Sequence, residues 1–176
     1  MSKKVFLKGT LILACTGLVS RIAGFFYRIF LSHAIGAEGL GLYQLILPLQ
    51  GLMAALSYTG IQSALSRLIA SRLALQEKKE AYFSLVTGIF AAVFFSAVTG
   101  FLLFRHADFF ASTILKAPGP SDFLRLTAAS IPLCAIHSCI DSYYYARKKA
   151  SVPAAVQLSE QAVRIGATYI LYLIFL

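Results

Sequence analysis

Charged residues are scarce in this chain of 176 residues. Asp, Glu, Lys and Arg make up 13% of it, and only seven residues are acidic. A soluble domain carries about 25% charged residues, so the composition excludes an ordinary soluble enzyme, a nucleic-acid-binding domain and a secreted domain. The hydrophobic fraction of 59% and the mean hydropathy of +0.76 indicate an integral membrane protein. The net charge of +9 does not alter this, because the basic residues form short clusters between apolar runs.

The chain also lacks the residues that covalent or metal chemistry needs. Its three cysteines lie inside apolar runs, and an odd number at such places excludes a disulfide framework. Cys134, His137 and Cys139 match no zinc-binding spacing. The sequence contains no nucleophile–base pair and no cofactor motif. We therefore expect no enzyme and no cofactor, and the energy source is left open between an ion gradient and the membrane potential.

Five apolar runs predict an all-α fold, a polytopic bundle of transmembrane helices in a single membrane domain. Gly36–Gly41 is expected to form a tight turn between the first two spans. Pro48 is expected to kink the second span, because proline removes a backbone hydrogen bond. The predicted spans are about 9–32, 42–70, 81–104, 123–146 and 152–176.

The distribution of the sixteen basic residues predicts the orientation. With the N-terminus in the cytoplasm, ten Lys and Arg fall in cytoplasmic segments, three fall outside and three lie within spans, which fits the positive-inside rule. The ten are Lys3, Lys4, Lys8, Arg67, Arg72, Lys78, Lys79, Arg147, Lys148 and Lys149. Because the chain stops at LYLIFL inside an apolar run, we expect it to be part of a larger transporter.

The first run carries two arginines that a lipid-facing helix would exclude. Arg21 and Arg28 are the only charged residues between Gly9 and Ser32, a segment long enough to cross a hydrocarbon layer of about 30 Å. With Gly17 and Gly24 they follow the spacing of one helical face. Such a face, in which small residues alternate with guanidinium groups, is typical of a bundle interior or a watery cavity.

The two arginines differ in their distance from the membrane surface. Arg28 lies near the end of the run, where its long side chain could instead reach the interface. Arg21 lies near the middle and has no such exit. We therefore expect Arg21 to line a cavity, and for Arg28 both interpretations stay open.

Two further runs carry polar faces. In the fifth run, Glu160 and Arg164 have the spacing and order of a favourable ion pair. They either tie helices together or form the polar wall of a transport path. In the second run, Gln62 belongs to a stripe of small and polar residues, which helix packing explains as well as a ligand path does. The fifth-run face comprises Gln157, Glu160, Gln161, Arg164 and Thr168.

Several segments together resemble a known family. LKGTLIL at 7–13, SRIAGFFYRIFLSHAIGAEGLGLYQLILPLQGL at 20–52, GIQSALSRLIA at 60–70 and YYYARKKASVPAAVQLSEQAVRI at 143–165 resemble segments of the stage V sporulation protein B family. That family belongs to the polysaccharide-flippase branch of the multidrug/oligosaccharidyl-lipid/polysaccharide exporter superfamily. The resemblance extends, in order, over nearly the whole chain.

The resemblance implies part of the first six-helix lobe of an exporter whose two lobes alternate access to a central cavity. The implied substrate is a polyprenyl-diphosphate-linked saccharide, such as a peptidoglycan precursor, moved across the bacterial cytoplasmic membrane. By the SRxxGF match, Arg21 corresponds to an arginine that holds the diphosphate in related flippases. The second such arginine falls at Tyr27, so Arg28 is displaced by one position. The residues expected to bind substrate are Arg21, Arg28, Gln62, Glu160 and Arg164.

Two other functions stay open. A cation-coupled multidrug exporter of the same superfamily would use cavity carboxylates, and Glu160 is the candidate. A truncated, non-transporting membrane paralogue is the other alternative. The expected partners are the lipid bilayer, a lipid-linked oligosaccharide and either the missing C-terminal part or another chain, without nucleic acid.

Overall fold

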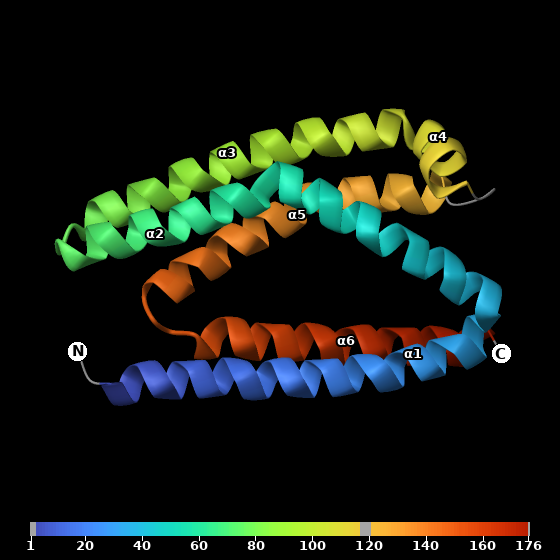
Figure 1. Cartoon of the computed structure of the whole chain (residues 1–176), viewed down its shortest axis with the longest axis horizontal. Helices are drawn as coiled ribbons and strands as arrows, with labels where there is room; N and C mark the ends of the chain where they lie inside the picture. The colour runs from blue at the N-terminus through green and yellow to red at the C-terminus, as the bar shows by residue number, and fades with distance from the viewer. Residues whose placement is uncertain (1–2, 117–120, 176) are drawn as a thin grey trace. The chain divides into compact units, whose positions relative to one another are not determined.

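The structure, a computed structural model, describes residues 3–116 and 121–175, and these form helices joined by short turns with no strand among them (Figure 1). This confirms the all-α prediction. The elements are α1 (Lys3–Ala54), the π-helical η1 (Ala55–Thr59), α2 (Gly60–Ala74), α3 (Lys78–Arg105), α4 (Ala107–Phe109), the π-helical η2 (Phe110–Leu115), α5 (Ser121–Ala146) and α6 (Ser151–Phe175).

The chain divides into two compact units. The first contains the residues up to Gly41 and those from Lys148 onward, so the first part of α1 lies beside α6 (Figure 1). The residue numbers of neighbouring positions rise in the same direction along both segments. Gly9 faces Ala150, directly before α6, and Gly24 faces Gln161. The helices are therefore parallel, which is the arrangement that a first and a fifth membrane crossing would have.

A single residue interrupts α1. Gly36 has φ 73° and ψ 176°, a backbone conformation that residues other than glycine rarely adopt. The residues on both sides stay helical. The predicted turn over Gly36–Gly41 is thus reduced to a break at its first residue. Gly39 and Gly41 continue the helix.

The second unit, Leu42–Arg147, is built around three long helices, α2, α3 and α5. α3 runs antiparallel to the other two. It packs against α2 after the short turn between Ala74 and Lys78, and along α5 it meets Cys139 at Gly88 but Ala128 at Gly100. Successive membrane crossings must alternate in direction in this way. Two apolar clusters form the interior of this unit; one is centred on Leu103 and Leu124, and the other on Ile69 and Cys139.

Small residues allow α3 to approach its neighbours closely. Gly88, Ala92, Ser96 and Gly100 recur at every fourth position along the face of α3 that is buried or half-buried. A Cβ atom at position 100 would come within 2.8 Å of the Ala128 carbonyl oxygen. The helix backbones meet here, as they do where small residues line the contact between membrane helices.

The predicted kink at Pro48 is wrong. Pro48 lies inside α1, whose backbone stays helical there, and the bend visible between α1 and α2 in Figure 1 coincides with η1. A π-helical turn is a common cause of helix bends. The hydroxyl groups of Ser57 and Thr59 donate hydrogen bonds to the carbonyl oxygens of Met53 and Ala54 in this turn. Such bonds satisfy backbone groups where water is absent.

Three helices of the described residues are long and apolar enough to cross a membrane: Gly9–Ala74, Lys78–Arg105 and Ser121–Ala146. The first contains both of the first two predicted spans. α6 has 25 residues, which is enough length, but it is not among the three. The polar residues on one of its faces lower its mean hydropathy. The five spans therefore remain a prediction.

Replacing Gly100 by Ala should destabilise the second unit. The added methyl group meets a backbone carbonyl at 2.8 Å, and relieving such a clash costs about 1–3 kcal/mol. We expect a lower midpoint of thermal unfolding, followed by circular dichroism in detergent. The control is Gly60→Ala, whose Cβ would meet nothing within 4 Å. Equal midpoints for the two variants would contradict the proposed contact.

Replacing Gly36 by Ala should also be destabilising, for a conformational reason. The position has φ 73° and open space around it, so the cost is backbone strain of about 1–3 kcal/mol. Gly41→Ala, in a helical conformation with no atom within 4 Å of the new methyl group, is the matched control. Denaturant unfolding of both variants measures the difference. A Gly36→Ala protein as stable as the control would mean that α1 is unbroken at this position.

Candidate anion-binding groove

A polar groove of about 620 Å³ lies between α1 and α6, within the first unit. It brings together three of the residues predicted to bind substrate, Arg21, Arg28 and Arg164. The lining residues are Gly17, Ser20, Arg21, Gly24, Phe25 and Arg28 of α1, and Gln157, Gln161 and Arg164 of α6.

The helical repeat of α1 places its four key residues along this groove. Gly17, Arg21, Gly24 and Arg28 all line it, as their spacing predicts. The glycines leave the space open beside the arginines: a Cβ atom at Gly17 would have no neighbour within 4 Å, and one at Gly24 would meet only the Gln161 amide nitrogen, at 3.6 Å. The side chains of Arg21 and Arg28 are both exposed, and both line the groove.

Arg164 is held by residues of both helices. Its guanidinium group donates a hydrogen bond to Oε1 of Gln161, and its Cζ atom lies 5.4 Å from the centre of the Tyr27 ring. The Tyr27 hydroxyl lies 3.2 Å from Oγ1 of Thr168, whose hydroxyl donates to the Arg164 carbonyl oxygen at 2.9 Å. A cation over an aromatic face is attracted by the ring quadrupole. Arg164 therefore has a defined position.

The groove carries three arginines. The ion pairs of Arg72, Arg125 and His137 lie outside the groove. Its lining contains no Asp or Glu. Three fixed cations at an open space favour an oxyanion, because guanidinium groups offer permanent charge and forked donors that match phosphate or carboxylate oxygens.

Two buried polar atoms in the groove have no hydrogen-bond partner within the described part of the chain. They are Oγ of Ser20 and Nε2 of Gln161. Gln161 is only 9% exposed. An unpaired buried donor costs about 1–3 kcal/mol. Because both residues line the groove, a ligand bound there could complete their bonding.

The other two predicted residues lie elsewhere. Glu160 is exposed on α6 and does not line the groove, although its neighbour Gln161 does. Gln62 is half-buried on α2 in the second unit, where its backbone carbonyl oxygen accepts a hydrogen bond from the Ser142 hydroxyl at 3.1 Å. Gln62 does not line the groove, and both interpretations of its stripe stay open.

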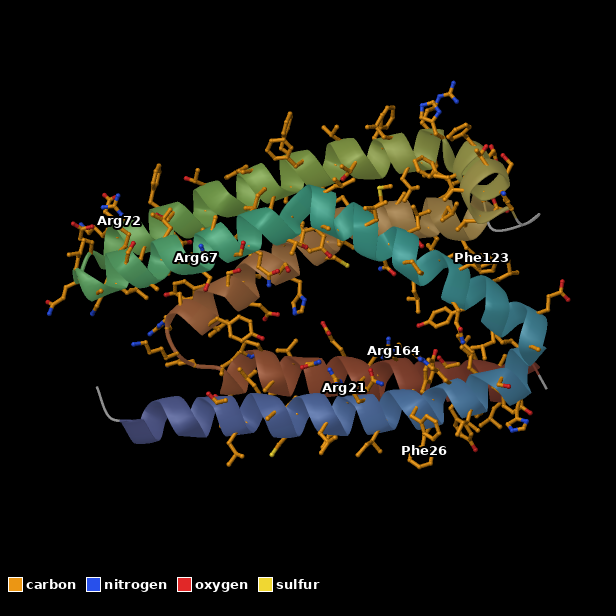
Figure 2. The ribbon with its side chains drawn as sticks, in the orientation of Figure 1. Arg21, Phe26, Arg67, Arg72, Phe123 and Arg164 are labelled. Carbon is orange, nitrogen blue, oxygen red and sulfur yellow. The ribbon has the colours of Figure 1, made fainter. Side chains whose placement is uncertain are left out.

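The same helix pair also forms an apolar pocket. This second pocket, of about 280 Å³, is lined by Ala23, Phe26, Tyr27, Phe30, Ile165 and Tyr169. Figure 2 shows Arg21 and Arg164 on the two adjacent helices. Phe30 contacts the rings of Tyr169 and Tyr172, with centroids 5.9 and 5.5 Å apart. Apolar packing therefore holds the helices together beside their polar face.

Sequence reasoning missed Ser20, Gln157 and Gln161 as residues of the site. The glutamines were placed on the polar face of the fifth run, and Ser20 is one helical turn before Gly24 on the same side of the first run. The sequence alone does not show that the first and fifth runs lie side by side. Among the described residues, no group of three or more His, Cys, Asp or Glu side chains is arranged to hold a metal ion.

Comparisons with known proteins identify the family of this chain. Residues 6–176 match the sequence profile of a family described as polysaccharide biosynthesis protein. The chain is 33% identical, over 181 aligned residues, to stage V sporulation protein B of Bacillus subtilis (strain 168). That alignment covers all of this chain and 34% of the relative, so the chain spans about a third of the relative's length. No solved structure matches. The chain belongs to the polysaccharide biosynthesis protein family.

Proposed function

We propose that this chain is part of a membrane flippase that moves a polyprenyl-diphosphate-linked saccharide across the bacterial cytoplasmic membrane by alternating access. The observation that supports this most strongly is the groove in which Arg21, Arg28 and Arg164 meet without a carboxylate among its lining residues. A diphosphate that crosses an apolar layer needs fixed cations along a hydrated path, because its desolvation is otherwise very costly.

The two helices supply different parts of such a path. α1 contributes Arg21 and Arg28, with open space beside both glycines. α6 contributes amides and Arg164, which is held in place by Tyr27. The adjoining apolar pocket around Phe26 and Phe30 would suit the hydrocarbon part of the substrate. The N-terminus is proposed to lie in the cytoplasm.

The relative's length bears on the mechanism. Alternating access requires two parts that rock against each other around a substrate site, and the chain spans about a third of stage V sporulation protein B. We therefore propose that further helices, from the same protein or from another chain, complete the carrier. The groove described above would form one wall of its substrate path.

Binding of a short polyprenyl diphosphate tests the anion site directly. The chain is placed in nanodiscs of zwitterionic lipid and titrated with farnesyl diphosphate by calorimetry. We expect binding, and about 10- to 100-fold weaker binding for Arg21→Gln, because a hydrogen bond between charged groups contributes about that factor. Farnesyl phosphate, with fewer charged oxygens, should bind more weakly than the diphosphate.

The matched control is Arg67→Gln, an exposed arginine of α2 in the second unit (Figure 2). It removes the same charge without touching the groove and should leave the affinity unchanged. Failure of the wild-type chain to bind the diphosphate would overturn the proposal. Tight binding of an organic cation that Glu160→Gln abolishes would favour the multidrug exporter instead.

Translocation is the second test. Proteoliposomes that contain the chain together with the helices that complete the carrier receive a fluorescent lipid-linked saccharide, and dithionite quenching measures its appearance in the outer leaflet. We expect Arg21→Ala to abolish flipping while the protein still inserts, because the diphosphate loses its central cation. Transport at the wild-type rate by this variant would contradict the assignment. Diphosphate binding by wild-type protein without any transport would favour the non-transporting paralogue.

A further inference from the structure

We propose that Ser20 and Gln161 form a second, uncharged part of the anion site, at which Oγ of Ser20 and Nε2 of Gln161 donate hydrogen bonds to an oxygen of the phosphate group. This rests on the proposed function and adds to it the atoms that would complete the phosphate's coordination. Arg164, besides adding its charge to the groove, is assigned a positioning role toward Gln161.

The orientation of the Gln161 amide follows from its partner. A guanidinium group can only donate hydrogen bonds, so the amide atom that accepts from Arg164 must be the oxygen. The nitrogen is thereby turned the other way, toward Gly24. Its hydrogens then lie beside Gly24, which has no side chain there.

The bonding of Gln161 also suits an anion rather than a cation. Oε1 is engaged by a positive group, which polarises the amide and strengthens Nε2–H as a donor. Nε2 and the Ser20 hydroxyl are both buried without a partner among the described residues, and both residues line the groove that carries Arg21 and Arg28. An oxyanion in the groove would thus meet charged and neutral donors together.

Arg164 is fixed before any ligand arrives. The Tyr27 ring lies 5.4 Å from its Cζ atom, and Thr168 joins the Tyr27 hydroxyl to the Arg164 backbone. This arrangement keeps the guanidinium group against Gln161 Oε1. Besides its charge, Arg164 therefore contributes to binding by holding the amide in its donating orientation.

The test compares variants that remove the neutral donors in different ways. Gln161→Met removes the donor at similar size, Ser20→Ala removes the hydroxyl, and Gly24→Ala covers Nε2 with a methyl group that fits at 3.6 Å. In nanodiscs of zwitterionic lipid, Gln161→Met should weaken farnesyl diphosphate binding about 10- to 100-fold. The other two variants should each weaken it about 10-fold. Inorganic pyrophosphate, titrated in parallel, distinguishes a lipid-linked ligand from a free one.

Matched controls carry the same chemical changes away from the groove. Ser159→Ala removes an exposed hydroxyl of α6, and Gly166→Ala adds a methyl group with nothing within 4 Å. Both should bind as the wild type does. If wild-type protein binds, Arg21→Gln weakens binding and Gln161→Met does not, the neutral subsite is wrong and the proposed function stands. If wild-type protein binds neither probe, both proposals fail.

Two readouts separate ligand contact from a structural role. In protein labelled with ¹⁵N-glutamine, the Gln161 side-chain resonance, identified by its loss in Gln161→Met, should move on addition of farnesyl diphosphate. An unmoved resonance would overturn the contact. For the positioning role, Gln161→Met combined with Arg164→Met should bind about as weakly as the weaker single variant. Multiplied losses would mean that Arg164 and Gln161 act independently, and would overturn the positioning role.

Discussion

The cost of placing charge in an apolar layer governs this structure. A guanidinium group facing lipid at mid-depth is strongly unfavourable, so arginines inside membrane helices must face protein or water. The groove between α1 and α6 meets this requirement for Arg21, Arg28 and Arg164 at one place. Glycine at two positions of α1 keeps the space beside them open. The aromatic packing around Phe30 then holds the two helices together.

The same constraint explains why α6 differs from the other long helices. Its apolar residues contact α1, while Gln161 and Arg164 are turned to the groove. The polar face makes the helix too hydrophilic to be recognised as a span by composition. A helix of this kind is stable in a bilayer only with a partner that covers or hydrates its polar face. α1 is that partner among the described residues.

The sequence predicted the helices and the composition of one wall of the groove. Helical periodicity was enough to place Arg21 and Arg28 on a single face, because that depends on local geometry alone. Their association with Arg164 depends on tertiary packing, which no local pattern specifies. The bend was assigned to Pro48 because proline was the visible helix breaker, yet it lies at the π-helical Ala55–Thr59, where serine and threonine hydroxyls satisfy the backbone. The break at Gly36 was correctly located but predicted to be longer.

The small-residue face of α3 has a consequence for how this protein can change over evolution. Gly100 lies against a backbone carbonyl of α5 that leaves no room for a methyl group, and a methyl group at Gly88 would require the Leu65 side chain to shift. The opposite surface carries Phe90, Phe94 and Phe101, all more than 60% exposed. Amino-acid substitutions should therefore be frequent on that outer surface, where any apolar residue serves, and rare on the inner one. In a collection of homologues, positions with a low and a high substitution rate would alternate along α3.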